Sequence, residues 1–382
     1  MLNFIATTTF GLEAIVKREA QNLGFLDITV EDGIVNFKGD LKDIPRANIN
    51  FRSADRVLMV MNKFKAMTFE ELFQGVYSIN WADFLPKDAN FIVSGKSLKS
   101  TLSSVPACQK ITEKAIVEKL KLTYKGVDYF SKSGNLYKIQ VALLKDNVTI
   151  TLDTSGIGLH KRGYRENQLF APLKETLASA LIDLSYYRKE RIFIDPTCGS
   201  GTIPIEAAMR AKNIAPGLMR NFASENWDFI DKSYWKEARK EAYSKIDVNF
   251  RPEIYGSDID EKAIQIAKAN AKIAGVDDCI RFEVKPLNKL DVKGIDYGVC
   301  VCNPPYAERI GVLEEVENLY RDMGKIFNSN KTFSAYILTS YEDFEKLYGR
   351  KADKKRKLFN GNIKVDYYQF FGEKPPKANK NN

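Results

Sequence analysis

Residues 191–195 read Arg191-Ile-Phe-Ile-Asp195, and the loop that follows reads Pro196-Thr197-Cys198-Gly199-Ser200-Gly201-Thr202. The apolar run predicts a buried strand that ends in a carboxylate, and residues 203–211 have the apolar spacing of a helix. The two glycines allow a tight turn. Open α/β sheets bind ligands at such strand ends, beside the free N–H groups of the next helix. The loop lacks the further glycine or lysine of dinucleotide and Walker-type phosphate sites, and Asp195 instead suits a positively charged ligand.

A second carboxylate-bearing strand end is expected in Gly256-Ser257-Asp258-Ile259-Asp260, between a strand at 253–258 and a helix at 261–274. A carboxylate at this position can accept hydrogen bonds from both hydroxyls of a ribose, which gives Asp258 a role in binding a nucleoside. Asp260 is better explained as the N-cap of the helix. The separation of Asp195 and Asp258 is well above the usual spacing of about 20 residues, so residues 210–252 are expected to be an insertion.

The third motif is Asn303-Pro304-Pro305-Tyr306, which follows an apolar strand at 297–302. Two prolines in a row fix φ near about −65°, so the carbonyl groups of Asn303 and Pro304 point in set directions. Two acceptors held in this way suit an exocyclic amine, and Tyr306 offers a face on which an extruded base can stack. A strand-terminating turn explains a Pro-Pro pair alone, but not its position after the two earlier motifs. The catalytic residues we expect are Asn303, Pro304 and Tyr306.

Together, the three motifs resemble those of the S-adenosylmethionine-dependent amino-methyltransferases that act on nucleic acid bases. The longer context at 160–165, 171–175, 206–211 and 213–217 resembles a narrower group, the THUMP-domain RNA methyltransferases, which include the bacterial large-subunit rRNA guanine-N2 methyltransferases. The resemblance covers nearly the whole chain and implies S-adenosylmethionine as the cofactor. Relatives usually carry an Asp where this chain has Pro286, and Asn288 is the substitute that the sequence offers. The expected cofactor contacts are Asp195, Pro196, Thr197, Cys198, Gly199, Ser200, Gly201, Thr202, Asp258, Ile259 and Asn288.

The expected fold class is α/β, with a C-terminal Rossmann-like methyltransferase domain at 171–372. Its sheet is expected to be mostly parallel, seven-stranded and closed by a hairpin that turns at Asn360-Gly361-Asn362. Before it, residues 1–155 mix short strands and helices in the α+β pattern of a ferredoxin-like region, and the resemblance implies a THUMP domain at about 44–155. Residues 156–170 are expected to be a basic linker. The polar, Pro-containing tail at 373–382 is expected to be disordered.

The chain has a formal net charge of +9, and residues 96–165 carry 13 Lys and Arg against 5 Asp and Glu. Such an excess favours an anionic partner, although a lysine-rich helix on its own is typical of a solvated surface. The resemblance makes RNA the partner, and it makes these basic side chains candidate RNA contacts. The RNA-binding residues we expect are Lys96, Lys99, Lys114, Lys119, Lys121, Lys161, Arg162 and Arg165.

The amino-acid composition argues against a zinc site, a Ser-His-Asp triad and a membrane-spanning segment. A single histidine, His160, and five cysteines without a CxxC pair cannot supply zinc-finger spacing or a Ser-His-Asp triad with a spare base. We expect no metal, because the methyl donor is already activated. An odd number of thiols without a signal peptide predicts reduced cysteines in the cytoplasm, and no apolar run reaches the roughly 18 residues that cross a bilayer.

These observations lead to one expected activity and leave alternatives open. The expected activity is transfer of a methyl group from S-adenosylmethionine to the N2 amine of a guanine in 23S rRNA. The same chemistry on tRNA is an equally compatible alternative. More distant ones are adenine-N6 methylation of DNA and a catalytically silent RNA-binding assembly factor. The oligomeric state and the target nucleotide stay open at this point.

Overall fold

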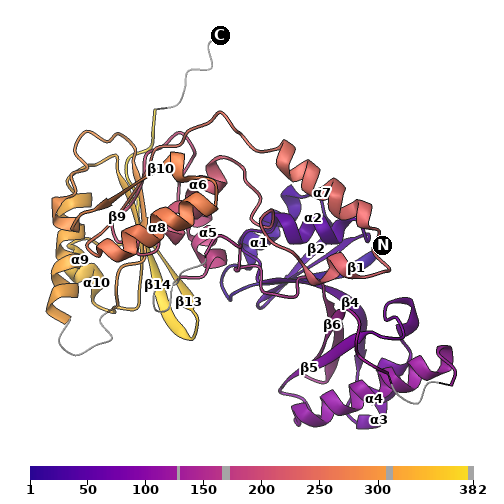
Figure 1. Cartoon of the computed structure of the whole chain (residues 1–382). Helices are drawn as coiled ribbons and strands as arrows, with labels where there is room; N and C mark the ends of the chain where they lie inside the picture. The colour runs from indigo at the N-terminus through magenta and orange to yellow at the C-terminus, as the bar shows by residue number, and fades with distance from the viewer. Residues whose placement is uncertain (127–129, 166–172, 307–312, 377–382) are drawn as a thin grey trace. The chain divides into compact units, whose positions relative to one another are not determined.

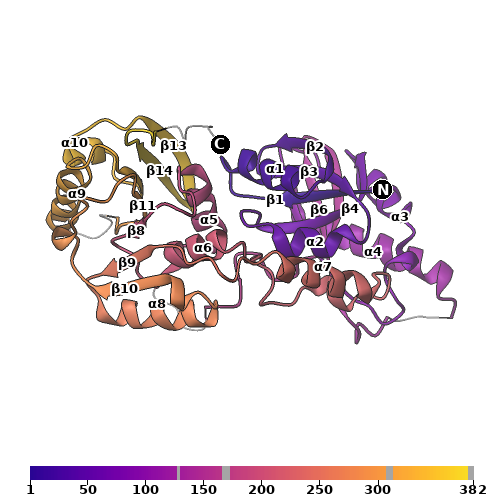
Figure 2. The same cartoon turned by 90° about the horizontal axis from the view of Figure 1, so that it is seen from above.

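The computed structural model describes residues 1–126, 130–165, 173–306 and 313–376. These residues form two compact units, which Figures 1 and 2 draw from two directions. The N-terminal unit comprises Met1–Thr8, Val16–Leu159 and Arg220–Glu241, and the C-terminal unit comprises Thr9–Ile15, His160–Met219 and Ala242–Asn382. Part of the insertion expected at 210–252 thus belongs to the N-terminal unit. A short segment near the N-terminus belongs to the C-terminal unit.

One seven-stranded sheet runs through the N-terminal unit in the order β2-β3-β1-β4-β7-β6-β5. Strands β5 and β6 are parallel, and the other neighbours are antiparallel. Strand β4 pairs with β1 on one side and β7 on the other, so it joins the two halves of the sheet. The strand bounds are β1 (Leu2–Thr7), β2 (Leu26–Glu31), β3 (Ile34–Gly39), β4 (Arg56–Lys65), β5 (Asn90–Leu98), β6 (Leu136–Leu144) and β7 (Asn147–Asp153).

The helices of this unit leave one face of the β5–β6 region open. A Cβ on Gly95 of β5 would lie 3.0 Å from Val105 and Gln109 of α4 and 3.5 Å from Val141 of β6, so these residues share the covered face. Because side chains alternate along a strand, Lys96 and Gln140 belong to the opposite face. The helix bounds are α1 (Glu13–Asn22), α2 (Asp43–Asn50), α3 (Phe69–Tyr77), α4 (Val105–Thr123) and α7 (Lys232–Ser244), with short 3₁₀ helices η1 (Trp81–Asp83) and η2 (Ala223–Asn226).

The C-terminal unit contains a second seven-stranded sheet in the order β10-β9-β8-β11-β12-β14-β13. Its first five strands are parallel, and β14 runs antiparallel to both β12 and β13. This order confirms the expected mostly parallel sheet that ends in a hairpin. The strand bounds are β8 (Phe193–Asp195), β9 (Ile254–Asp258), β10 (Ile280–Val284), β11 (Val299–Cys302), β12 (Ser334–Thr339), β13 (Lys354–Asn360) and β14 (Ile363–Phe370).

Every residue of β11 and β12 is buried, as expected of parallel strands covered on both faces. Cys300, Cys302 and Ile337 of these strands belong to one apolar core with Tyr320 and Met323 of α9. The central strands therefore place their carboxyl ends, rather than their faces, within reach of a ligand. The helix bounds are α5 (Glu175–Leu184), α6 (Thr202–Ala211), α8 (Glu261–Ile273), α9 (Leu313–Phe327) and α10 (Phe344–Tyr348), with 3₁₀ helices η3 (Asp277–Cys279) and η4 (Leu287–Lys289).

Two expectations fall partly outside the described residues: those for residues 166–170 of the basic linker and for residues 377–382 of the tail. All five cysteines are buried and carry free thiols. Across the described residues, no helix combines the length and apolar character that crossing a membrane requires.

Candidate functional site

The loop after β8 forms the first wall of the candidate site. Asp195, the last residue of β8, is only 1% exposed, and its Oδ1 accepts a hydrogen bond of 3.2 Å from the N–H of Thr197. Gly199 and Gly201 adopt positive φ angles of 51° and 82°, a conformation that favours glycine, and α6 begins directly afterwards. The Oγ1 of Thr197 is buried without a hydrogen-bond partner among the described residues. The loop therefore holds polar groups that a ligand can satisfy.

The environment of Asp195 favours a cation. Burial raises the pKa of this carboxyl well above its ordinary value, and the negative charge of Asp258 raises it further. A positively charged ligand group would reverse this effect, because it stabilises the ionised carboxylate. The position is thus suited to an ammonium group.

The loop after β9 is bonded to the loop after β8. Asp258 accepts a hydrogen bond of 2.9 Å from the N–H of Gly199 at Oδ2 and one of 3.0 Å from the N–H of Asp260 at Oδ1. The side chain of Asp260 in turn accepts from the N–H of Lys262 at 2.9 Å, so the expected N-cap of α8 is confirmed. A Cβ on Gly256 would lie 2.7 Å from the ring of Phe282, which explains a glycine in β9.

Apolar side chains are exposed where β9 and β10 end. Ile259 is 75% exposed and Val284, which pairs with Asp258, is 52% exposed. Pro286 is the N-cap residue of η4, and Asn288 lies exposed within this short helix. Because β8, β9 and β10 are parallel neighbours, their carboxyl ends lie on the same side of the sheet. Ile259 and Asn288 therefore lie at the same end of the strands as Asp195.

The remaining residues of the expected cofactor set shape the loop through their main chains or are buried beside it. The N–H of Cys198 donates to the carbonyl of Ser257 at 2.9 Å, and the carbonyl of Ser200 accepts from Asn270 Nδ2 at 3.1 Å. Pro196 and Thr202 are buried. These contacts hold the two carboxylate-bearing loops in one arrangement.

The Asn-Pro-Pro-Tyr motif follows β11, the strand paired with β8. The hydroxyl of Tyr306 donates a hydrogen bond of 2.5 Å to Asn303 Oδ1. The main-chain carbonyl of Pro305 accepts a hydrogen bond of 3.0 Å from the hydroxyl of Tyr320. The same hydroxyl is hydrogen-bonded to Thr339 Oγ1 at 2.8 Å. The motif is therefore fixed both internally and by α9 and β12.

Sequence reasoning missed three residues that hold this motif in place: Tyr320 and Asn360 bond it directly, and Thr339 bonds Tyr320. Asn360 Nδ2, at the end of β13, lies 3.4 Å from the hydroxyl of Tyr306. Each of the three lies at least 14 residues from Tyr306 along the chain. No local pattern in the sequence points to them.

The basic segment that follows the N-terminal unit corrects an expectation. Arg162 and Arg165 were expected to contact RNA from a solvated loop, but Arg162 is 2% exposed and its Nε lies 3.3 Å from Oε1 of Glu206. Arg165 forms an ion pair of 3.4 Å with Glu175 and donates at 2.5 Å to Thr202 Oγ1, the first residue of α6. Lys161 remains exposed. Arg162 and Arg165 therefore use their charges in ion pairs inside the fold, with Glu206 of α6 and Glu175 of α5, and Arg165 also bonds the first residue of α6.

The expected lysines of the N-terminal unit do not form one surface. Lys114, Lys119 and Lys121 belong to α4, where Lys121 pairs with Glu118 at 2.9 Å and Lys119 lies 5.2 Å from the ring centre of Tyr77. Lys96 is on the opposite face of the sheet, and Lys99 follows β5 and is exposed.

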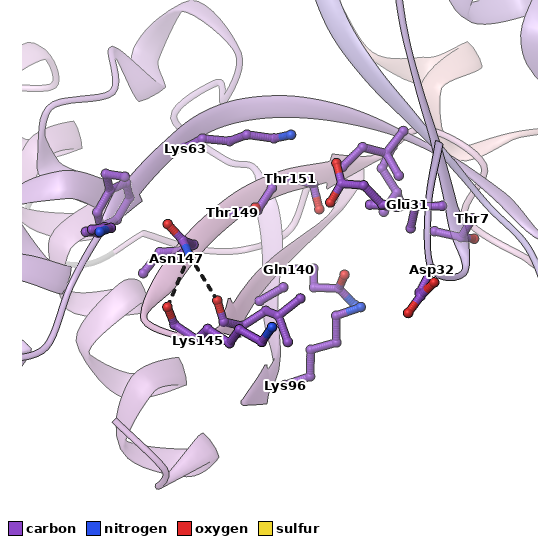
Figure 3. A pocket seen from close by; sticks show the side chains of 18 residues that line it. Thr7, Glu31, Asp32, Lys63, Lys96, Gln140, Lys145, Asn147, Thr149 and Thr151 are labelled. Carbon is purple, nitrogen blue, oxygen red and sulfur yellow. Dashed lines mark hydrogen bonds between the residues drawn. The ribbon is translucent and has the colours of Figure 1, made fainter. Parts of the chain in front are cut away.

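Lys96 lines a groove of about 690 Å³ on the open face of the sheet (Figure 3). The groove also holds three lysines that the sequence analysis did not select: Lys63 and Lys65 of β4, and Lys145 of the β6–β7 turn. Polar side chains of Gln140, Asn147, Thr149 and Thr151 lie between them, while Glu31 and Asp32 lie at one end. Lys63 and Lys65 alternate with Phe64, which is the one sequence signal that places them on a common face.

No group of three or more His, Cys, Asp and Glu side chains within the described ranges is arranged to hold a metal ion.

Three family models match the chain in succession. The model described as "RlmL ferredoxin-like domain" matches residues 3–58, the THUMP domain matches 66–153, and "RMKL-like, methyltransferase domain" matches 162–369. Strand β4 lies across the boundary between the first two, which is why their strands form one sheet.

Similar proteins cover nearly the whole chain. The chain is 50% identical over 377 residues, 98% of its length and 97% of the relative's, to "Putative RNA methyltransferase YpsC" of Bacillus subtilis (strain 168). It is 49% identical to a crystal structure described as a predicted N6-adenine-specific DNA methylase from Listeria monocytogenes, with a TM-score of 0.93 over 97% of this chain and 96% of that one. It is 44% identical to the structure of SMU.472 complexed with SAH, with a TM-score of 0.92 over 98% and 99%.

Fold, motifs and matches define a methyltransferase domain preceded by a THUMP domain and a ferredoxin-like domain. The chain belongs to the RMKL-like methyltransferase family.

Removing the guanidinium of Arg162 should destabilise the protein. Arg162→Ala leaves the buried Glu206 without its charge partner, so the free energy of unfolding should fall by about 3–5 kcal/mol. Chemical denaturation measures this, and Lys161→Ala, at the exposed neighbouring position, should change it by less than about 0.5 kcal/mol. Equal small effects for the two variants would contradict the structural role of Arg162.

Proposed function

We propose that this protein is an S-adenosylmethionine-dependent RNA methyltransferase that methylates the exocyclic N2 amine of a guanine in 23S rRNA. The observation that carries the proposal is the position of the Asn-Pro-Pro-Tyr motif at the end of β11, directly beside the end of β8. The amine acceptors follow β11, and the loop that carries Asp195 follows β8, the strand paired with it. Methyl transfer needs the amine acceptors and the cofactor loop within one site.

The residues of the first two loops fit S-adenosylmethionine. Asp195 is a buried carboxyl suited to an ammonium group, and Thr197 has a buried hydroxyl without a partner among the described residues. In this proposal Asp258 accepts from the ribose hydroxyls, while Ile259 and Asn288 lie against the adenine. The relative SMU.472, complexed with SAH, supports this choice of cofactor. When bound, the cofactor supplies an electrophilic methyl group on a sulfonium.

The third motif then orients the nucleophile. In this proposal Asn303 uses its side-chain Oδ1, in place of the main-chain carbonyl that the sequence pointed to. Asn303 Oδ1 and the carbonyl of Pro304 accept the two hydrogens of the amine, so the nitrogen lone pair is directed out of that plane. A carbon–nitrogen bond forms as the carbon–sulfur bond breaks, and the amine afterwards loses one proton to solvent. Asn303 Oδ1 accepts from Tyr306 in this structure, so the incoming amine shares or replaces that bond. The ring of Tyr306 is proposed to stack on the base.

RNA is the proposed substrate because of the THUMP match and the relative YpsC, whose name describes an RNA methyltransferase. In the N-terminal unit, we propose that phosphates bind along the groove lined by Lys63, Lys65, Lys96 and Lys145. The choice of guanine as the base and of 23S rRNA as the substrate rests only on the sequence resemblance of residues 160–217.

The alternatives differ in substrate rather than in site. Methylation of guanine in tRNA would use the same residues. Adenine-N6 methylation of DNA corresponds to the name given to the Listeria protein and would use the same amine acceptors. A silent RNA-binding assembly factor would have no need of an intact Asn-Pro-Pro-Tyr motif.

Asn303→Ala tests the catalytic assignment. The variant loses one amine acceptor, so kcat for methyl transfer to RNA should fall roughly 10²–10³-fold, the effect of removing one polar contact to a developing charge. Affinity for SAH, measured by calorimetry, should stay unchanged, because Asn303 is not in the proposed cofactor set. Tyr306→Phe, which removes only the hydroxyl, is the matched comparison. Wild-type turnover by Asn303→Ala would remove Asn303 from the mechanism.

A triple variant tests the groove. Lys63→Gln, Lys65→Gln and Lys96→Gln together should weaken RNA binding and lower the slope of log K against log salt by roughly two to three units, since each phosphate contact contributes about 0.7–0.9. Filter binding at several salt concentrations measures the slope. The triple variant Lys114→Gln, Lys119→Gln and Lys121→Gln should change it less. The charge of Lys121 is already paired with the carboxylate of Glu118, and Lys119 lies over the ring of Tyr77, whereas Lys63 bonds the neutral amide oxygen of Asn36. The reverse ranking would move the RNA to the α4 face.

A further inference from the structure

The tip of the β13–β14 hairpin extends past the edge of the sheet that carries the three motifs. β12 is parallel to β11 and ends at Thr339, which pairs with Asp366 of β14. Because β14 begins at Ile363, three residues precede that pair, and at about 3.3 Å per residue they reach roughly 10 Å beyond β12. The hairpin is drawn in yellow in Figure 1. Its turn therefore projects beyond the carboxyl ends of the parallel strands.

The hairpin tip contacts the base-binding motif. Asn360, the last residue of β13, lies 3.4 Å from the hydroxyl of Tyr306, which donates to Asn303. Asn360, near the hairpin tip, is thus linked through Tyr306 to the amine acceptor Asn303.

A segment from the start of the chain packs on this hairpin. Gly11 has a φ of 91°, and a Cβ at this position would lie 3.2 Å from Leu358 Cδ2 and from the carbonyl of Lys357. Its N–H donates to Glu13 Oε2 at 2.9 Å, which fixes the turn. Residues Thr9–Ile15 belong to the same compact unit as the hairpin. The neighbouring Phe10 is therefore held against β13 by a turn that only glycine adopts readily.

Phe10 presents an aromatic ring that the described residues cover only in part. The side chain is 54% exposed, and its ring centre lies 6.4 Å from that of Phe359 in an edge-to-face arrangement at 72°. Phe359 pairs across the hairpin with Lys364, which is exposed. Lys357, two residues before Phe359, is exposed as well. An exposed ring beside unburied ammonium groups is the combination that binds a base and its phosphate in single-stranded nucleic acids.

We propose that Phe10, supported by Phe359 and flanked by Lys357 and Lys364, binds a nucleotide adjacent to the methylated one. Its base stacks on the ring of Phe10, and the lysines contact the phosphates. This inference rests on the proposed RNA methylation and adds to it a second nucleotide position on the C-terminal unit. An extruded target base needs its neighbours to be held in place, since unstacking them costs free energy.

The test compares Phe10→Leu with Phe10→Trp in methyl transfer to total RNA purified from cells that lack this protein. Phe10→Leu keeps an apolar side chain but loses the aromatic face, so KM for RNA should rise roughly tenfold, while SAH affinity stays at the wild-type value. Phe10→Trp should restore the wild-type KM. Tyr243→Leu, at a residue that is 57% exposed and outside the site, is the matched control and should leave KM unchanged.

A photo-crosslinking residue at position 10 gives an independent readout. After irradiation with the same RNA, crosslinks should map within about two nucleotides of the methylated base. If the wild type methylates RNA and Phe10→Leu has the wild-type KM, or if crosslinks map elsewhere, the inference is wrong although the proposed function stands. If the wild type methylates no RNA, the proposed function fails, and this inference fails with it.

Discussion

The buried carboxyl of Asp195 is the constraint on which the C-terminal unit depends. At 1% exposure it accepts a hydrogen bond from Thr197, and it forms no ion pair within the described ranges. Burying an ionised carboxylate without a cation is costly, by several kcal/mol. Burial raises the pKa of the carboxyl for this reason, and a positively charged ligand would stabilise its ionised form. The glycine loop and the bond from Gly199 to Asp258 build a ligand site around this carboxyl.

Local sequence patterns predicted most of this site, because its main chain follows strand–loop–helix rules. The strand ends at Asp195 and Asp258 and the N-cap at Asp260 could be read directly from apolar runs and their breaks. The contacts of Tyr320 and Asn360 could not, because they depend on how α9 and the hairpin pack around β11. Long-range packing of this kind leaves no periodic signal.

The positions of charged residues in the sequence did not predict which of them lie at the surface. A run of basic residues is usually solvated, yet Arg162 and Arg165 lie inside the fold because Glu206 and Glu175 are buried opposite them. In the N-terminal unit, the sequence could not tell that β4 joins the ferredoxin-like and THUMP strands into one sheet. Only this pairing places Lys63 and Lys96, which lie on different strands, along a common groove. The alternation of side chains predicts which residues share a face of one strand, but it does not predict which strands are neighbours in the sheet.

The most direct test of the account is transfer of labelled methyl groups from S-adenosylmethionine to total RNA from cells lacking this protein, followed by size separation and nucleoside analysis. The account predicts label in large ribosomal RNA, recovered as N2-methylguanosine. Label confined to tRNA would keep the site and change the substrate. Absence of label from all RNA, with SAH still bound by the protein, would contradict the central claim that this site methylates RNA.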